Sequence, residues 1–252
     1  MPEQSNNTQP LLQMIDIYKS FGRVRVLRGV DFEIAPGEVV GLCGDNGAGK
    51  STLIKVISGY HQAEKGQIFL EGKEVNIKSP HESRALGIET VYQDQALATQ
   101  LSISRNIFMG REPTTVLGLM DRKAMADQSM EAMTGLGLKI NSTDTLVGTL
   151  SGGQRQGVAI ARVIHFKAKL VILDEPTIAL AVKEVREVLE FVRHLRSEGV
   201  SVIFITHTLH HVFDVADRIA VMAHGTIIAD ISTKNTDVDE LSDIIVRGTY
   251  GE

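Results

Sequence analysis

A glycine-rich segment in the first quarter of the chain has the residue types and the spacing that bind a polyphosphate. Residues 44–51 read G-x-x-x-x-G-K-S, between the apolar run Val39–Cys43 and a helical pattern that starts at Lys50. In this context backbone N–H groups form a nest for phosphate oxygens at the positive end of the helix. We therefore predict a phosphate-binding loop formed by Gly44, Asp45, Asn46, Gly47, Ala48, Gly49, Lys50, Ser51 and Thr52.

Polar side chains at the ends of other apolar runs could complete a hydrolytic site. Lys50 would place a positive charge on the terminal phosphates, and the Ser51 hydroxyl would bind a magnesium ion, which prefers oxygen ligands. Asp174 and Glu175 directly follow the buried-strand pattern Leu170–Leu173, and ligands of open α/β sheets bind at such strand ends. Asp174 is predicted to hold the magnesium through its water shell, and Glu175 to orient and deprotonate the attacking water.

Two further polar residues end strand patterns of the same kind. His207 follows the apolar run 200–206 and is predicted to contact the terminal phosphate. Gln93 follows the strand pattern 87–92, and its amide could both donate and accept hydrogen bonds in the site, although this signal is weak by itself. His210 and His211 lie in a helical pattern without the acidic or cysteine partners of a metal site.

A second anion-binding surface is predicted about a hundred residues after the first. Leu150-Ser151-Gly152-Gly153-Gln154 precedes the helical pattern 155–166. Ser151 is a natural helix cap, and the glycines expose N–H groups at the positive end of the helix dipole. A plain capped helix is the alternative interpretation, and the residues alone leave open why one nucleotide would need two such surfaces.

The elements that must position these residues alternate between strands and helices. We expect paired strands over 11–33 with a turn at Phe21, a hairpin of strands 67–70 and 75–77, and strands over 217–221 and 226–231. Helices are expected over 50–58, 182–197 and 238–246. Strand patterns disappear between residues 96 and 149, where helical patterns cover 103–109 and 121–136, which predicts a small helical insert. By spacing alone Phe21 is a core or turn aromatic, although its ring could stack on a base.

Composition limits the class of protein. The 252 residues carry a formal net charge of −5, which disfavours a nucleic-acid partner. The single cysteine excludes an internal disulfide, and its place in an apolar run favours a buried, unreactive thiol. The longest span without Asp, Glu, Lys or Arg is too short and too polar to cross a bilayer. Residues 1–10 are polar and predict a disordered tail, not a secretory signal, so we expect a cytoplasmic protein.

Taken together and in this order, the motifs resemble the ATP-binding subunit of an ABC transporter. The resemblance extends from about Leu11 to Gly248. It implies an α/β fold: a P-loop NTPase core (11–95 and 150–248) with a mixed, mainly parallel sheet, an N-terminal antiparallel β subdomain and an inserted α-helical subdomain (about 96–149), all within one domain of 11–248. The implied cofactors are ATP and Mg²⁺.

The resemblance also assigns roles to residues whose function was open. Two subunits associate head to tail, so that Ser151, Gly152, Gly153 and Gln154 of one close over the γ-phosphate held by Lys50 of the other. Phe21 becomes the aromatic that stacks on adenine, Gln93 the link between magnesium and the coupling surface, and His207 the γ-phosphate switch. Glu175 is implied as the catalytic base.

A narrower similarity connects the chain with the ATPases of ribose-, xylose- and fructose-type sugar importers. It is carried by four stretches of sequence: 58–61, 91–95, 106–112 and 207–225. It implies a homodimer or heterodimer of ATPase subunits at the inner face of the cell membrane, bound to membrane-spanning permease subunits and served indirectly by a periplasmic or extracellular sugar-binding protein. A soluble ABC-type ATPase with a regulatory, translation or repair role is the alternative.

One residue departs from the pattern of the family. Ala181 stands where an aspartate usually helps to tie the two ATP sites together. The resemblance therefore leaves communication between the two sites open, while ATP binding is expected as in the family. Sugar-importer ATPases vary at this position, so the change fits that branch as well as it fits weakened activity.

Overall fold

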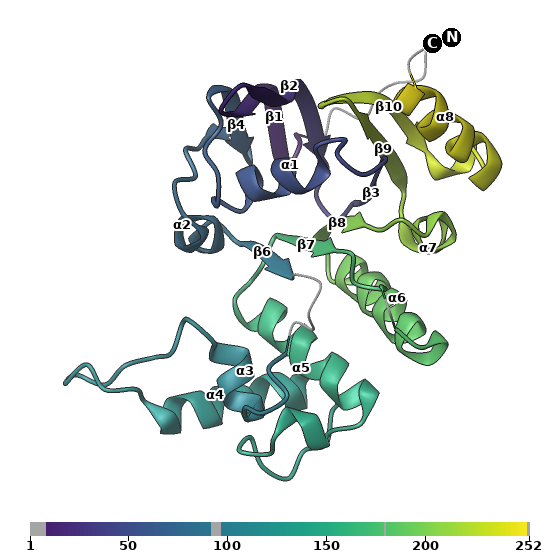
Figure 1. Ribbon diagram of the computed structural model, residues 1–252. Coiled ribbons are helices and arrows are strands. Elements are labelled where there is room, and N and C mark those ends of the chain that lie inside the picture. The colour runs from purple at the N-terminus through teal and green to yellow at the C-terminus, as the bar shows by residue number, and fades with distance from the viewer. Residues whose placement is uncertain (1–8, 92–96, 179, 251–252) are drawn as a thin grey trace.

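The computed structural model describes residues 9–91, 97–178 and 180–250, which form a sheet-rich upper part and a helical lower part (Figure 1). Residues 1–8 of the predicted tail lie outside the described residues, as does Gln93. The described residues contain no helix that is long and apolar enough to cross a membrane.

In the segments 9–91, 97–178 and 180–250, ten strands form two sheets. The first has the order β2-β1-β4-β5 and is antiparallel, and the second has the order β10-β9-β3-β8-β7-β6. In the second sheet only the edge pair β9–β10 is antiparallel. The bounds are β1 Leu12–Phe21, β2 Val24–Ile34, β3 Val39–Cys43, β4 Lys65–Leu70, β5 Lys73–Glu74, β6 Ile88–Val91, β7 Leu170–Asp174, β8 Ser201–Ile205, β9 Arg218–Ala223 and β10 Thr226–Ser232.

Eight α-helices accompany the sheets in the described residues. Their bounds are α1 Lys50–Ile57, α2 Pro80–Ala85, α3 Ile103–Phe108, α4 Arg122–Gly135, α5 Gly152–His165, α6 Val182–Ser197, α7 Leu209–Val215 and α8 Val238–Tyr250. Short 3₁₀ turns occupy Val147–Thr149 and Thr233–Asn235.

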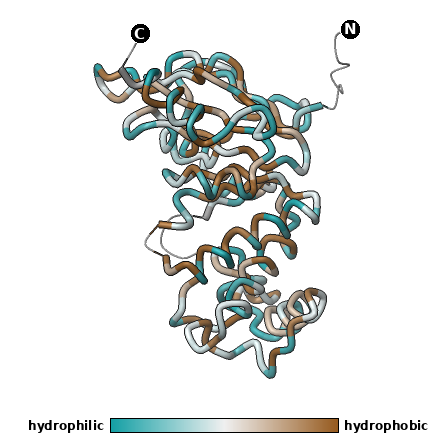
Figure 2. The backbone as a smooth tube through the Cα atoms, turned by 90° about the vertical axis from the view of Figure 1, so that its right-hand side faces the viewer, coloured by the Kyte–Doolittle hydropathy of each residue, from teal (hydrophilic) through white to brown (hydrophobic). Residues whose placement is uncertain are grey.

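The central strands β3, β7 and β8 are mostly apolar, because both faces of the larger sheet are covered. Alternate residues of β3 face opposite sides: Val40 and Leu42 join a core with α1 and the antiparallel sheet, while Val39 and Cys43 join a core with α5, α6, α7 and α8. Helix α1 thus lies between the two sheets. Hydrophobic stretches run through both the sheet part and the helical part (Figure 2). Burial raises the pKa of the Cys43 thiol to about 12, so this cysteine behaves as a core residue.

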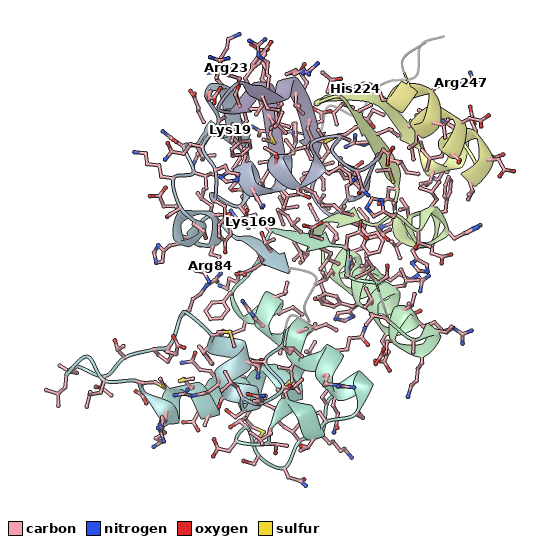
Figure 3. The ribbon with its side chains drawn as sticks, in the orientation of Figure 1. Lys19, Arg23, Arg84, Lys169, His224 and Arg247 are labelled. Atoms are coloured by element: carbon pink, nitrogen blue, oxygen red, sulfur yellow. The ribbon has the colours of Figure 1, made fainter. Side chains whose placement is uncertain are left out.

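The helical part has its own apolar core. Side chains of α3, α4 and α5 pack together around Ile103, Met125, Met133 and Val158. A buried ion pair joins this part to the sheet, because Arg111 contacts Glu89 of β6. Arg84 extends from α2 on the same side of the molecule (Figure 3), and its guanidinium lies near Gly110.

One local prediction was wrong, and one helix was missed. The second strand of the hairpin predicted over 67–77 is β5 at residues 73–74, and not 75–77, because the chain leaves β4 after Val75 and buries Ile77 against the end of α1. Helix α2 was not predicted. The residues at its start are nevertheless typical of a helix N-terminus. The Ser79 hydroxyl caps the helix by accepting a hydrogen bond from the Glu82 N–H, and Pro80 is the first helical residue.

Candidate functional site

The glycine-rich loop connects β3 to α1 and depends on glycine at three positions. Gly44, Gly47 and Gly49 have backbone φ angles of 138°, 84° and 112°, which residues with a Cβ rarely adopt. A Cβ on Gly44 would lie 2.1 Å from the carbonyl oxygen of Met222 in β9. The loop therefore rests directly on the neighbouring strand, and the Gly225 N–H braces it further by donating to the Ala48 carbonyl at 2.9 Å.

Lys50 folds back onto the loop that precedes it. Its ammonium donates to the carbonyl of Gly44 at 2.6 Å and to that of Asp45 at 3.0 Å, and the residue is only 7% exposed. Burial lowers the pKa of Lys50, and the negative charge of Glu175 opposes this shift. The positive charge is thus held at the centre of the loop by neutral carbonyl oxygens, which a polyphosphate would replace with charged ones.

The acid pair leaves β7 at the edge of the sheet where β3 and β8 also end. Glu175 has a left-handed backbone with φ of 51°, and its N–H donates to the Ile205 carbonyl of β8 at 2.9 Å. Burial raises the pKa of both carboxyl groups: Lys50 opposes the shift at Asp174, and His207 opposes it at Glu175. A carboxylate with a raised pKa is a stronger proton acceptor once it is ionised.

His207 contacts Glu175 through both its backbone and its ring. The His207 N–H donates to Glu175 Oε2 at 3.4 Å, and the ring Nε2 lies 3.1 Å from Oε1. The second contact has ion-pair distance but no hydrogen-bond geometry, since Oε1 is buried and forms no hydrogen bond. A buried carboxylate oxygen without a hydrogen bond is costly, and Glu175 Oε1 is such an atom.

One cavity of about 240 Å³ unites these groups. Gly44, which was also predicted, does not line it, whereas the loop residues 45–52, Asp174, Glu175 and His207 do, together with Val26 and Ile205. Sequence reasoning missed the last two residues. Val26 belongs to an alternating strand and Ile205 to a continuous apolar run, so neither differs in pattern from an ordinary core residue.

The chain does not bring every predicted residue to this cavity. Phe21 is 44% exposed at the end of β1, where its ring packs edge-on against His61 at 5.0 Å between centroids and lies 5.6 Å from the Lys19 ammonium. It does not line the cavity. Lys19 and Arg23 flank it in sequence and lie at the antiparallel sheet (Figure 3).

The second predicted anion surface is also separate from the cavity. Residues 151–154 begin α5, where the Ser151 hydroxyl accepts from the Gln154 N–H at 3.3 Å and the Gln154 side chain accepts from the Ser151 N–H at 3.1 Å. This reciprocal capping box is the predicted helix cap. None of the four residues lines the cavity, so within one chain the phosphate loop lacks this surface.

A hydrogen-bonded group of side chains next to Glu175 and His207 in the chain was not predicted. Thr177 Oγ1 lies 3.3 Å from Thr206 Oγ1 and 3.2 Å from His211 Nδ1, and the Thr208 N–H donates to Thr206 Oγ1 at 3.2 Å. The group joins the loop that carries Glu175 to the loop that carries His207. His211, which the sequence marked only as unsuited to a metal site, has this structural partner instead.

The donor set fits magnesium held mainly by water and phosphate. In the part of the chain that the structure describes, no three His, Cys, Asp or Glu side chains gather to form a metal-binding cluster. The cavity is lined instead by the Ser51 hydroxyl, the Asp174 carboxylate and the Glu175 carboxylate with its orphaned oxygen. Hard oxygen donors in this number suit Mg²⁺, which retains several waters and binds substrate phosphates.

The fold and the cavity define a nucleotide-binding protein of the phosphate-loop class, with an acid pair for hydrolysis. The chain belongs to the ABC transporter family, whose model matches residues 27–178, and it is an ABC-type ATPase. The fold and family expected from the sequence are thereby confirmed.

Three relatives are sugar import ATP-binding proteins by name. The xylose/arabinose import protein of Sulfolobus acidocaldarius is 47% identical over 96% of both chains, and the fructose import protein of Rhizobium meliloti is 46% identical over 90% of both. The ribose import protein of Escherichia coli O157:H7 is 38% identical over 95% of this chain, which spans only 47% of that protein. An ATP-binding cassette of an ABC transporter, solved in its ADP conformation, shares the fold with a TM-score of 0.77 and 27% identity over 97% of this chain and all of that chain.

Proposed function

We propose that this chain is the ATP-hydrolysing subunit that energises a membrane importer of a monosaccharide. The observation that carries the proposal is the single cavity in which the phosphate loop, the acid pair and His207 meet. The names of the relatives, which are import proteins for xylose or arabinose, fructose and ribose, support a monosaccharide as the cargo. They do not favour the alternative of a soluble regulatory, translation or repair ATPase.

The residues of the cavity would act on ATP as follows. Lys50 exchanges its contacts with the Gly44 and Asp45 carbonyls for the terminal phosphates, which the loop N–H groups also bind. Ser51 and Asp174 would hold Mg²⁺, which supplies positive charge beside the phosphates when it is bound. Catalysis then depends mostly on positioning and on neutralising the charge of the γ-phosphoryl group.

Two residues act on the attacking water and on the γ-phosphate. Glu175 orients the attacking water and accepts its proton. His207 contacts the γ-phosphate from the end of β8, and its backbone N–H keeps Glu175 Oε2 in place. The group formed by Thr177, Thr206 and His211 holds the two loops together while this occurs.

The active form would be a head-to-tail dimer of ATPase subunits, identical or different. Because residues 151–154 do not line the cavity of their own chain, Ser151, Gly152, Gly153 and Gln154 would close over the γ-phosphate bound by a second subunit. Phe21 would stack on the adenine, and Gln93 would connect magnesium to the coupling surface.

Transport requires further partners. The segment from about 96 to 149, which we regard as a helical subdomain inserted into a core of 11–95 and 150–248, would pass the motion to membrane-spanning permease subunits. A periplasmic or extracellular sugar-binding protein would deliver the cargo. The chain would thus lie at the cytoplasmic face of the cell membrane, held there through the permease.

Substitution of the proposed base tests the mechanism. Glu175→Gln should retain ATP binding and trap the closed dimer on size-exclusion chromatography, while steady-state phosphate release falls to background. Glu240→Gln, a change at an exposed residue of α8, is the matched control and should keep the parental rate. Phosphate release by Glu175→Gln close to the parental rate would remove Glu175 as the base.

Reconstitution tests the biological role. The chain is combined with candidate permease subunits in proteoliposomes, and ATP-dependent uptake of labelled xylose, fructose and ribose is measured. Uptake of one of these sugars that is lost with Glu175→Gln is the expected result. ATP hydrolysis that no permease stimulates, without uptake, would favour a role outside transport.

A further inference from the structure

The connection between α3 and α4 is an ordered hairpin that projects from the helical part (Figure 1). We define the hairpin as residues 113–121. Its two arms are joined by backbone hydrogen bonds: the Thr115 N–H donates to the Leu119 carbonyl at 2.7 Å, and the Asp121 N–H donates to the Pro113 carbonyl at 2.8 Å. Gly118 closes the turn with φ of 75°. The shape is therefore fixed by the hairpin itself and not by packing against the body of the protein.

The tip of this hairpin consists of exposed apolar side chains. Val116, Leu117 and Leu119 are 106%, 86% and 67% exposed. Isolated apolar residues on a surface are ordinary, but a contiguous group that protrudes in a fixed shape indicates an interaction site. The phosphate cavity does not include any of these residues, so the proposed ATPase chemistry does not explain them.

The exposure of the tip favours a lipid surface over a protein groove. All three apolar side chains are exposed by two thirds or more, so no side of the tip rests on the protein. The interfacial region of a bilayer surrounds an inserted tip on every side and requires no matching shape.

The base of the hairpin carries the charge that complements an anionic membrane. Between residues 105 and 123 the chain has four basic and two acidic residues, although its overall net charge is −5. Arg111 is paired with Glu89, and the Asp121 carboxylate accepts the Ala124 N–H as the cap of α4. Three further cations lie at the base: Arg105, whose guanidinium contacts Met120 Sδ at 3.7 Å, and the exposed Arg122 and Lys123. Against the acidic Glu112 and Asp121 they leave a small excess of positive charge there.

We propose that hairpin 113–121 inserts its apolar tip into the surface of a bilayer that contains anionic lipids, while Arg105, Arg122 and Lys123 face the headgroup phosphates. Apolar burial and attraction to anionic headgroups add together in such contacts. The contact is made by this chain itself and is separate from any permease subunit, so it goes beyond the proposed function. It needs neither ATP nor hydrolysis.

The absence of tryptophan from the sequence provides a direct reporter. Leu117→Trp places a single tryptophan at the tip, and its emission is recorded with vesicles of phosphatidylcholine alone and with vesicles that also contain phosphatidylglycerol. We expect a blue shift and quenching by brominated lipid, much stronger with the anionic vesicles and weakened by salt. Val246→Trp, at an exposed apolar position of α8, is the matched control and should not respond.

Loss-of-function variants then separate the two contributions. Replacing Val116, Leu117 and Leu119 by serine should lower vesicle co-sedimentation by about tenfold or more, because several buried methylene groups are lost. Serine at Val24, Ile228 and Val246 removes exposed apolar side chains elsewhere and should leave co-sedimentation unchanged. Arg122→Gln with Lys123→Gln should weaken binding to anionic vesicles and flatten its dependence on salt.

Three results would overturn the proposal. The first is an unchanged Leu117→Trp emission at saturating anionic lipid. The second is a blue shift that appears without lipid as protein concentration rises, which would identify a second copy of the chain as the partner. The third is a blue shift that requires detergent-solubilised permease, which would identify a protein groove. Thermal melts and ATP binding of each variant, compared with the parent, verify its fold, and the tryptophan result decides the question if the serine variant does not fold.

Discussion

Helix α6 begins without a side-chain cap. One substitution at its N-cap measures how much the missing cap lowers the free energy of unfolding. Ala181 occupies the N-cap position with extended backbone (φ −68°, ψ 155°) and has no side-chain acceptor for the N–H groups of the first turn. Half of a capping box is nevertheless in place, because the Glu184 carboxylate accepts the Ala181 N–H at 3.0 Å. Ala181→Asp would supply the missing acceptor without changing the backbone.

The expected size of the effect follows from the geometry. Replacing alanine by aspartate at an N-cap with this backbone stabilises a protein by about 1 kcal/mol, within a range of about 0.5–2 kcal/mol. For a domain of this length, that corresponds to a rise in Tm of roughly 2–4 °C. Ala181→Ser should give most of the same gain, since the hydroxyl forms the cap without a charge.

The assay is urea unfolding of the nucleotide-free chain, followed by circular dichroism. Val182→Asp is the matched control: it places the same charge one residue later, where the side chain is 72% exposed and cannot form the cap. This control should gain only the interaction with the helix dipole, about 0.3–1 kcal/mol. The reasoning is refuted if Ala181→Asp and Ala181→Ser are no more stable than the parent, or if Val182→Asp gains as much as both.

Three other substitutions test the site and its supports by urea unfolding. Burial raises the pKa of Glu175 above its ordinary value of 4.5, so its contribution to stability is complete below that pH and is lost as the pH rises through the folded pKa. Glu175→Gln should therefore be more stable than the parent at pH 8, and a difference that does not shrink toward pH 4 would contradict this. Gly44→Ala should lose at least ~2 kcal/mol together with ATP binding, because a Cβ would collide with a carbonyl of β9. Gly153→Ala, where a Cβ meets nothing within 4 Å, should lose no stability; equal losses would refute the steric argument. Arg111→Ala removes one ion pair of the buried Glu89 and should cost less than the roughly 3–5 kcal/mol of a fully unpaired charge, because Arg84 and Arg162 line the same cavity as Glu89. The double variant Arg111→Met, Glu89→Gln should recover most of that loss, and equal losses in the single and double variants would show that the charge is not the cause.

Much of the fold could be predicted because strand burial leaves a direct signal. The runs 39–43, 170–173 and 202–205 are apolar at every position, and each lies in a strand covered on both faces. The loop residues, the acid pair and His207 could be placed in one cavity because parallel strands end at the same edge of a sheet.

Other features depend on packing that no local pattern records. Val75 and Ile77 alternate like a strand, yet Ile77 is buried against α1 and the strand is Lys73–Glu74. The contact of Gly44 with β9 and the return of Lys50 to its own loop require the positions of residues far apart in the chain. The same holds for the hydrogen bond between Thr177 and His211.

Strand β8 lies between β3 and β7 in the larger sheet, although it follows both of them in the chain. The strands that carry the phosphate loop and the acid pair are thus joined only through β8, by register pairs such as Val40 with Ile203 and Leu173 with Phe204. Pairing between strands far apart in the chain must overcome the entropy of closing a long loop before any contact forms. Such pairing therefore slows folding. During synthesis, the chain should therefore acquire nucleotide binding late, after β8 has left the ribosome. A nascent chain that stops before Ser201 would contain the whole phosphate loop and still bind no ATP.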